Sequence, residues 1–433
     1  MNRQTKPVRY AVGMFGTSIP INMFKTYAAI YYVDQLGLST ALFSLTLFIY
    51  TFIDALDNPI YGYLSDRTRT RWGRRRPWLV IGAPLLGLGL LAFYNPPSFL
   101  AGNALFVYFL ISYIFTGTID SLVNANYGAL FPELFQDDAV RASTNAMRQA
   151  FQLVAMIISI ALTPMVAGAL GYPLTALLYG ILGAGVILYS TFGCYENPEY
   201  QKQAKPQLWD SIKTLAANQK FWIAGFANAF YSATMSLVLA SIPFYVKYVL
   251  QVADAQATLL FATVLLIAIA AIGVWARLVK RYAVVPVWRA ALVVLAVSFI
   301  PLYFVNSLVT AMLASALVGI GFAGVICTMD LIGARIIDED SAKSGVRREA
   351  IYSNAIGFMN RLNGLFTSLA FYLVYAWYGF ESGDAPGPNP AQAVRFLLVI
   401  FPFVLMVISA LFARFLKFDE KQEVSHGRPV PHH

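Results

Sequence analysis

Long apolar stretches follow one another along almost the whole chain, and they constrain its fold more than any other feature. A membrane-spanning helix needs about 20 consecutive, mostly apolar residues. Only 12% of the 433 residues are charged, against about 25% in soluble domains. We therefore predict an all-α membrane protein with twelve transmembrane helices. The expected ranges are 9–36, 42–64, 78–95, 102–131, 144–170, 173–195, 220–249, 256–279, 285–305, 308–332, 350–379 and 393–416.

Basic residues are distributed unevenly over the connections between these stretches. If the N-terminus lies in the cytoplasm, almost all of the 31 Lys and Arg residues fall on the cytoplasmic side. The outer connections 36–41, 96–101, 170–172 and 306–307 have none. This is the positive-inside distribution. We therefore expect both termini in the cytoplasm of a bacterial-type inner membrane. The net charge of +9 then reflects topology and not a nucleic-acid partner.

A polar stretch at 196–219 divides the predicted spans into two sets of six. We expect an N-terminal six-helix bundle at 1–195, a cytoplasmic central loop at 196–219, and a C-terminal six-helix bundle with a cytoplasmic tail at 220–433. When two such bundles are repeats of one another, the binding site lies near the middle of the membrane, where the repeats meet.

Two acids lie inside the predicted span at 42–64. Asp54, Asp57 and Asn58 have spacings of three and four residues, which place them on one helical face. Two acids on one face repel each other unless a cation, a proton or a basic partner lies between them. We therefore expect a site for a coupling ion, Na⁺ or H⁺. The alternative is an ion pair that only holds helices together, with Lys25 as its base.

Polar residues also form stripes on other predicted spans, and a polar stripe in a membrane helix must face protein or water. We expect the following residues to face the substrate: Ser18, Asn22, Lys25, Asp120, Asn124, Tyr127, Arg148 and Arg361. For Arg148, a cavity role and a role as a gate or structural ion pair remain equally open.

Six arginines lie within ten residues at 67–76, directly after the acidic helix. Such a loop holds the helix end at the cytoplasmic surface. We expect ion pairs of this loop with neighbouring helices to govern the inward-closed state. The expected gating residues are Asp66, Arg67, Arg74 and Arg75.

Other residue types exclude several functions. Cys194 and Cys327 lie far apart in apolar segments, and all three histidines lie in the polar tail at 426–433. We therefore expect no disulfide framework, no cofactor, and no metal site beyond a Na⁺ at the two acids. GIGFAG at 319–324 matches a dinucleotide-binding pattern, but it lies inside an apolar span, where small residues serve helix packing. No nucleophile with a base is visible, so we do not expect an enzyme.

Several motifs point to a known family. The sequences DALDNPIYG at 54–62, RWGRRRPW at 71–78 and YGALFP at 127–132 resemble the glycoside–pentoside–hexuronide:cation symporters, the melibiose permease group of the major facilitator superfamily. The resemblance extends over nearly the whole chain. It implies a twelve-helix major facilitator fold and alternating access, with sugar uptake driven by Na⁺, Li⁺ or H⁺.

The resemblance also implies roles for single residues. Asp54 matches the first acid of the family's cation site, and Ser121 matches a hydroxyl ligand on helix four. Arg148 matches an arginine at the substrate site. Arg361 stands where the family usually has a functionally important lysine.

The chain departs from the family pattern at several of these positions. Asp57 and Asn58 stand in the reverse of the family's order, and Ser18 and Asn124 replace acids that grip sugar hydroxyls. Recognition of galactosides is therefore not implied, whereas coupling to Na⁺ or H⁺ is. In a second interpretation, the ammonium of Lys25 occupies the cation's position, which makes the protein proton-coupled or uncoupled.

These observations favour a cation-coupled symporter, acting as a monomer in the lipid bilayer, that takes up a sugar or glycoside. One alternative is a carrier of a lysolipid-like or other amphiphilic substrate, because the acids that grip sugars are missing. An alternative of another class is a membrane sensor or assembly factor that does not transport. Saturable sugar uptake distinguishes the first hypothesis from the second. Tight ligand binding without exchange across the membrane would favour the third.

Overall fold

The computed structural model describes residues 5–135, 138–196, 217–344 and 349–418, and every named element in these ranges is a helix. Nine of the described helices are long and apolar enough to cross a membrane, or ten if the bent pair Ser143–Ala161 and Thr163–Leu170 is one span. The all-α membrane protein predicted from the apolar stretches is therefore confirmed.

Two of the twelve predicted spans, 9–36 and 350–379, are helical but broken. The first consists of α1 (Pro7–Ala11), α2 (Gly13–Ala29) and the π-helix η1 (Ile30–Gln35), and the second consists of α15 (Glu349–Arg361) and α16 (Asn363–Tyr378). Each carries a charged side chain, Lys25 or Arg361, which lowers the mean hydropathy of its helix. The breaks divide each stretch into helices of 17 residues or fewer, although most of the residues are helical.

The chain divides into two compact units. The first unit contains Met1–Lys205, Val252–Thr258 and Phe371–Pro390, and the second contains Pro206–Gln251, Leu259–Ala370 and Ala391–His433. The predicted central loop at 196–219 lies mostly outside the described residues. The domain boundaries placed there stay predictions.

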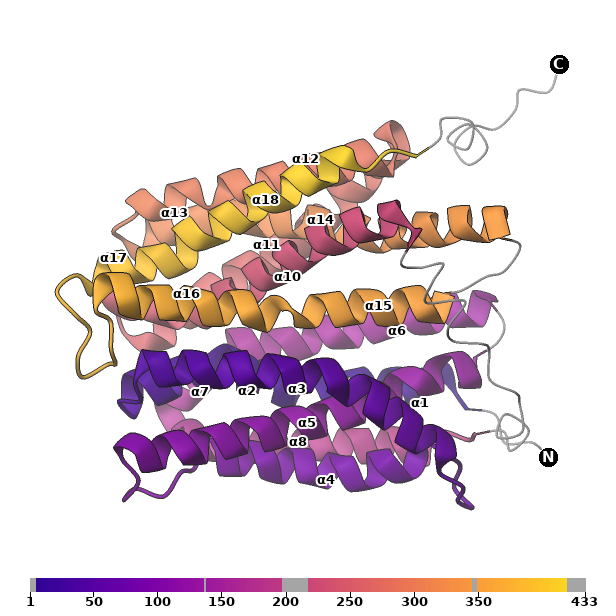
Figure 1. The fold of residues 1–433 in the computed structure, drawn as a ribbon, viewed down its shortest axis with the longest axis horizontal. Coiled ribbons are helices and arrows are strands. Elements are labelled where there is room, and N and C mark those ends of the chain that lie inside the picture. Colours follow the sequence, from indigo (N-terminus) through magenta and orange to yellow (C-terminus); the bar gives the residue numbers. More distant parts are fainter. Residues whose placement is uncertain (1–4, 136–137, 197–216, 345–348, 419–433) are drawn as a thin grey trace. The chain divides into compact units, whose positions relative to one another are not determined.

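Long helices form the larger part of the first unit (Figure 1). They are α2, α3 (Thr40–Arg67), α4 (Arg76–Phe93), α5 (Gly102–Leu134), α6 (Asp138–Met156) and α8 (Tyr172–Phe192), and the shorter α1, η2 (Ile157–Ala161) and α7 (Thr163–Leu170) belong to the same unit. Helix α4 packs against both α5 and α8, and α3 packs on α5. Leu79, Val123, Leu130 and Ile187 belong to the buried core between these helices.

Glycines allow the helices of the first unit to approach closely. A Cβ atom at Gly87 on α4 would lie 3.0 Å from the carbonyl oxygen of Gly180 on α8. A Cβ atom at Gly16 on α2 would lie 2.9 Å from the backbone nitrogen of Ile187 on the same helix α8. Lipid gives no hydrophobic driving force between helices, so close backbone packing of this kind holds the bundle together.

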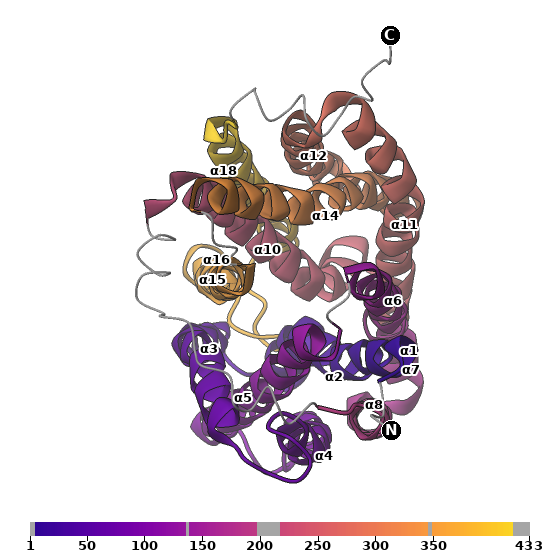
Figure 2. The same cartoon turned by 90° about the vertical axis from the view of Figure 1, so that its right-hand side faces the viewer.

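The second unit is also a helical bundle. Its helices are α10 (Gln219–Tyr245), η4 (Val246–Leu250), α11 (Ala257–Tyr282), α12 (Val284–Ser298), α13 (Ile300–Phe304), α14 (Leu308–Ser344), α15, α17 (Pro390–Arg395), η6 (Phe396–Ile400) and α18 (Phe401–Phe415). Helix α12 packs against α14 and α18, and α10 packs against α18 and α15, as the end-on view of Figure 2 shows.

The GIGFAG segment at 319–324 lies on α14 and contacts neighbouring helices. A Cβ atom at Gly319 would lie 2.6 Å from the carbonyl oxygen of Val264, and one at Gly321 would lie 2.6 Å from the Cα atom of Leu295. These glycines serve close packing, as the sequence predicts, and not phosphate binding.

Candidate functional site

The two acids of α3 are buried. Asp54 is 8% exposed and Asp57 is 6% exposed. Asp54 Oδ1 accepts hydrogen bonds from Ser121 Oγ on α5 at 2.9 Å and from Tyr50 Oη, one turn earlier on α3, at 3.3 Å. The structure therefore brings together Asp54 and Ser121, the acid and the hydroxyl that the sequence assigns to the cation site.

A second hydroxyl of α5 reaches the second acid. Thr118 Oγ1 donates to Asp57 Oδ2 at 3.1 Å. The sequence analysis missed Thr118, although its three-residue spacing from Ser121 places both hydroxyls on one face of α5. The side chain of Asn58, the third predicted member of the site, lies outside the described part of the structure. The acids and hydroxyls offer only oxygen atoms, which are the ligands that hard cations prefer.

The polar stripe predicted on α5 is partly paired within itself. Asp120 is buried, and Asn124 Nδ2 donates to Asp120 Oδ1 at 2.6 Å and to its carbonyl oxygen at 3.2 Å. The two residues expected to face the substrate therefore orient each other, as residues four positions apart on a helix do.

On α2, the three predicted residues have different environments. Ser18 is buried, and Asn22 Nδ2 donates to Ser159 Oγ on η2 at 3.1 Å. Lys25 is exposed and makes no ion pair with either acid of α3 within the described residues. The predicted pairing of Lys25 with these acids is absent from this conformation. The reason is that the Lys25 side chain is directed to an exposed position and not into the contact between α3 and α5.

Tyr127 on α5 and Tyr10 on α1 form reciprocal hydrogen bonds and stack their rings. Tyr127 Oη donates to the carbonyl oxygen of Tyr10 at 2.9 Å, and Tyr10 Oη donates to the carbonyl oxygen of Tyr127 at 2.7 Å. Their rings stack with centroids 4.6 Å apart. The hydroxyl hydrogen of Tyr127 is therefore engaged inside the protein, which leaves its ring face as the part that can contact another group.

Arg148 on α6 lies against that ring face. Its Cζ atom is 4.8 Å from the ring centroid of Phe131, 5.4 Å from that of Tyr127 and 5.7 Å from that of Tyr10, within cation–π range. Its Nη2 atom donates to Met14 Sδ at 3.9 Å, and its buried Nε atom has no acceptor among the described residues. Among the described residues, the guanidinium therefore keeps donors that a bound polar group can use.

Arg361 is the last residue of α15 and belongs to the second unit. It is half-buried. The other predicted substrate-facing residues all belong to the first unit.

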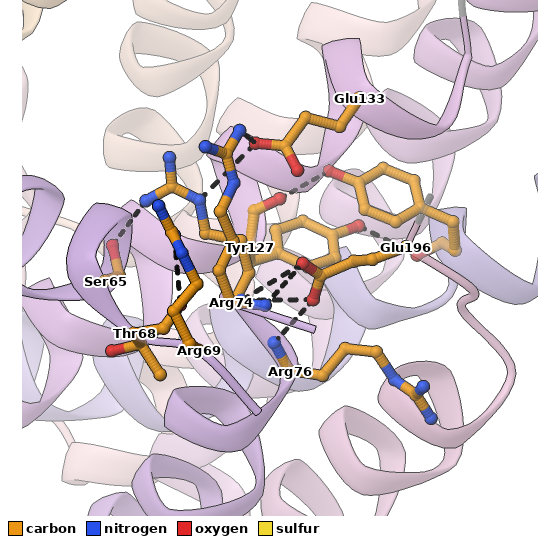
Figure 3. A network of polar contacts seen from close by, with 10 residues as sticks. Ser65, Thr68, Arg69, Arg74, Arg76, Tyr127, Glu133 and Glu196 are labelled. Atoms are coloured by element: carbon orange, nitrogen blue, oxygen red, sulfur yellow. Dashed lines mark hydrogen bonds and ion pairs between the residues drawn. The ribbon is translucent and has the colours of Figure 1, made fainter. Parts of the chain in front are cut away.

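The arginine-rich loop after α3 is held by carboxylates (Figure 3). Arg74 Nη2 lies 2.6 Å from Glu133 Oε1, and Arg75 Nε lies 3.5 Å from the same oxygen. Arg75 Nη1 donates to Ser65 Oγ on α3. This network connects the end of α3, the start of α4 and the end of α5, so it fixes three helices of the first unit to one another.

Glu196 accepts hydrogen bonds at the start of α4. Its carboxylate accepts from the backbone N–H groups of Arg74 at 2.8 Å, Arg75 at 3.1 Å and Arg76 at 2.9 Å. The first N–H groups of a helix have no partner within the helix, and the helix dipole favours negative charge there. Gly73 makes room for the carboxylate, because its φ is +110° and a Cβ atom there would lie 2.4 Å from Glu196 Cδ.

Two of the four predicted gating residues therefore contact their partners in this network. Arg67 is exposed, and the side chain of Asp66 lies outside the described part of the structure. The sequence analysis missed both acids, Glu133 and Glu196. The available signal was their position, since each follows an apolar run that ends on the same predicted face of the membrane as the arginines.

Within the residues that the structure describes, no three His, Cys, Asp or Glu side chains lie close enough to hold a metal ion. The features that remain are long apolar helices, buried acids with hydroxyl donors, and a basic loop at the helix end. They are typical of an integral membrane transporter.

Comparison with protein families leads to the same class. The family described as "MFS/sugar transport protein" matches residues 9–420, and the chain belongs to this family. The resemblance inferred from the motifs is thereby confirmed at the level of the family, as is the prediction of a transporter and not an enzyme.

Characterised relatives cover most of the chain. It is 24% identical over 426 residues to the isoprimeverose transporter of Lactiplantibacillus pentosus, which covers 95% of this chain and 88% of that protein. It is 22% identical over 426 residues to the glucuronide carrier protein homolog of Escherichia coli, covering 96% of this chain and 93% of that protein.

Solved structures share the fold at low sequence identity. The nucleoside transporter NupG has a TM-score of 0.71 at 11% identity and covers 97% of this chain and 100% of its own. A D-xylose-proton symporter has a TM-score of 0.68 at 15% identity and covers 98% of both chains. These likenesses establish the major facilitator fold that the sequence predicts.

Proposed function

We propose that the protein is a secondary transporter that couples the movement of Na⁺ or H⁺ to uptake of a sugar or glycoside. Family membership supports the sugar class, because relatives are named as transporters of isoprimeverose, glucuronides and lactose. In this proposal the protein works as a monomer in a bacterial-type inner membrane, with both termini in the cytoplasm.

The observation that carries the proposal is the pair of buried acids on α3. An ionised side chain at the bilayer centre costs at least ~2.5–3.5 kcal/mol on insertion scales. The hydroxyl groups of Ser121 and Thr118 offset part of that cost by donating to the carboxylates. Two acids on one helical face repel each other when both are ionised. A proton or Na⁺ that binds between them when the site opens to one side relieves this repulsion, which gives the coupling.

The substrate groups of the proposal lie on the helices beside the acids. Arg148 offers guanidinium donors next to the Tyr127 ring, and Asn22 and Asn124 offer amides that suit sugar hydroxyls. Alternating access then exposes the loaded site to one side of the membrane at a time.

The test compares coupled and uncoupled transport in proteoliposomes. We expect Asp54→Asn and Asp57→Asn to lose gradient-driven sugar accumulation at least tenfold while sugar counterflow continues. The exposed Asp254, at the start of the short helix η5 (Asp254–Gln256), gives a matched control, since Asp254→Asn makes the same chemical change at an exposed position. An imposed Na⁺ gradient and an imposed pH gradient, applied separately, identify the ion. If accumulation and counterflow are both untouched in the two variants, the coupling assignment is wrong.

The same vesicles separate the alternatives. Saturable uptake of radiolabelled sugars, with no uptake of lysolipids, contradicts an amphiphile carrier. Tight sugar binding without counterflow would favour a sensor that does not transport.

A further inference from the structure

The second unit contains a cavity of about 580 Å³ that the site on α3 does not use. Side chains of α10, α14 and α15 line it, and all of them belong to the second unit. Its volume lies within the roughly 300–1,000 Å³ of small-molecule pockets. A single proton or metal ion does not need a space of this size.

Asp330 is the most unusual side chain in this cavity. It belongs to the apolar helix α14, inside the candidate span Leu308–Asp340, and its carboxylate is exposed. It has no hydrogen bond and no ion pair among the described residues. Acids within membrane spans are costly and mark sites of ligand or ion passage. The carboxylate is therefore available to a group that enters the cavity.

Amide groups stand beside this acid. Asn228 Nδ2 on α10 donates to Asn360 Oδ1 on α15 at 2.6 Å. One amide oxygen and one NH₂ group remain available to a ligand, whichever way the two amides are assigned. Tyr231, one turn after Asn228 on the same helix, lines the cavity together with Asp330. The cavity thus offers a carboxylate acceptor, an amide donor, an amide acceptor and a phenol.

The rest of the wall is mostly apolar, with a second acid, Asp338, which already interacts with other groups, and without a base. Ile326, Met329 and Ile356 line the cavity, and no Lys or Arg is among its lining residues. An anionic group is therefore disfavoured, because no lining residue balances its charge against Asp330 and Asp338. A neutral ring with adjacent hydroxyls on its edge and C–H groups on its face matches both parts of the wall.

We propose that this cavity is a subsite for an uncharged sugar ring. The Asp330 carboxylate accepts hydrogen bonds from two neighbouring hydroxyls, the Asn228–Asn360 pair binds a third, and the apolar side chains cover the ring face. This inference rests on the proposed function, sugar transport, and adds the residues in the second unit that select the sugar.

The experiment measures binding to the purified full-length chain in lipid nanodiscs, without an ion gradient. The probes are 1-O-methyl glycosides of a pentose, a hexose and a hexuronide, and the best-binding probe is then compared with its monodeoxy analogues. Hydrogen bonds to a charged group contribute enough for a loss of about 10-fold or more when one partner is removed. We expect Asp330→Asn to weaken binding of the best probe by at least tenfold.

The deoxy analogues make the test specific. For the analogue that lacks the hydroxyl bound by Asp330, we expect the wild-type protein and Asp330→Asn to bind within about threefold of each other. Asn360→Ala gives a second variant of the same cavity if Asp330→Asn fails to fold. Asp254→Asn is the matched control and should bind as the wild type does.

Each outcome is decisive. If the probe binds the wild-type protein and both cavity variants equally well, the subsite is refuted while sugar transport stands. If Asp330→Asn binds normally and keeps counterflow but loses H⁺-driven accumulation, the carboxylate carries a proton, and the subsite is again refuted. If no glycoside binds the wild-type protein, both the subsite and the proposed function fail.

Discussion

Removal of the Glu196 carboxylate should open the segment that follows α8. Three backbone N–H groups at the start of α4 donate to this carboxylate at 2.8 to 3.1 Å. A hydrogen bond to a charged group contributes about 1.5–3 kcal/mol when it is well buried. Glu196 is only half-buried, and water can rehydrate the released N–H groups. We therefore expect Glu196→Ala to lower the free energy of this local opening by about 2 kcal/mol in total.

Cys194 reports on that opening because it is 1% exposed and lies two residues before Glu196. Burial raises the pKa of the Cys194 thiol to about 12. The thiolate is the reactive form. The folded protein therefore holds the thiol neutral below about pH 12, and labelling at pH 7.5 proceeds through opened molecules, in which the pKa returns to about 8.5.

The assay is a time course of maleimide labelling in nanodiscs, followed by mass spectrometry, with Cys327→Ser as the background. Since about 1.4 kcal/mol is tenfold, 2 kcal/mol predicts labelling about 30 times faster for Glu196→Ala. Glu133→Gln is the matched control. It removes the carboxylate charge beside Arg74 and leaves the three N–H bonds intact, so we expect less than a threefold change.

The pH profile checks the interpretation. Labelling through an opened segment should level off above about pH 8.5, whereas labelling of the buried thiol in place should keep rising tenfold per pH unit toward 12. The reasoning is refuted if Glu196→Ala labels at the wild-type rate, or if Glu133→Gln accelerates labelling equally.

Other substitutions test single contacts. Gly73→Ala should accelerate the same labelling at least as much as loss of the carboxylate does, because its φ of +110° is strained for alanine and its Cβ would collide with Glu196. Gly117→Ala should raise the cation concentration for half-maximal uptake several-fold with little change in maximal rate, because its Cβ would lie 2.3 Å from the Tyr50 hydroxyl and displace it. Asn218→Ala should lower the free energy of unfolding by about 1 kcal/mol through loss of the N-cap of α10. Thermal unfolding checks this value against Asn218→Asp, which keeps the cap.

Local sequence patterns predicted the parts of the site that depend on one helix or on family motifs. The spacing of Asp54 and Asp57 placed both on one face of a helix, and the motif pairing of Asp54 with Ser121 agrees with their 2.9 Å contact. The partner of the α4 N-terminus was not predictable in the same way. Glu196 lies at least 120 residues along the chain from the backbone N–H groups that donate to it, and several other acids in this chain also follow apolar runs. The sequence alone therefore does not show which acid accepts these hydrogen bonds, because tertiary packing decides it.

Asp330 was missed for a different reason, which concerns where a helix ends. The predicted span at 308–332 places Asp330 two residues before its end, and the sequence analysis gave this acid no role. In the structure α14 continues to Ser344, so Asp330 lies well inside a helix and lines a cavity. A change from apolar to charged sequence marks the limit of lipid contact. It does not mark the end of the helix, because a helix can continue into regions where water or protein surrounds it.

The two acidic positions should therefore respond differently to the same substitution. At Asp54, the hydroxyls of Ser121 and Tyr50 can still donate to the amide oxygen of Asp54→Asn, so these two hydrogen bonds remain while the charge that attracts a cation is gone. At Asp330 no hydrogen bond or ion pair within the described residues depends on the carboxylate, so Asp330→Asn should change only what the cavity can bind. Because of this difference in surroundings, we expect Asp54→Asn to lose coupling and to keep sugar binding. We expect Asp330→Asn to weaken sugar binding and to keep coupling.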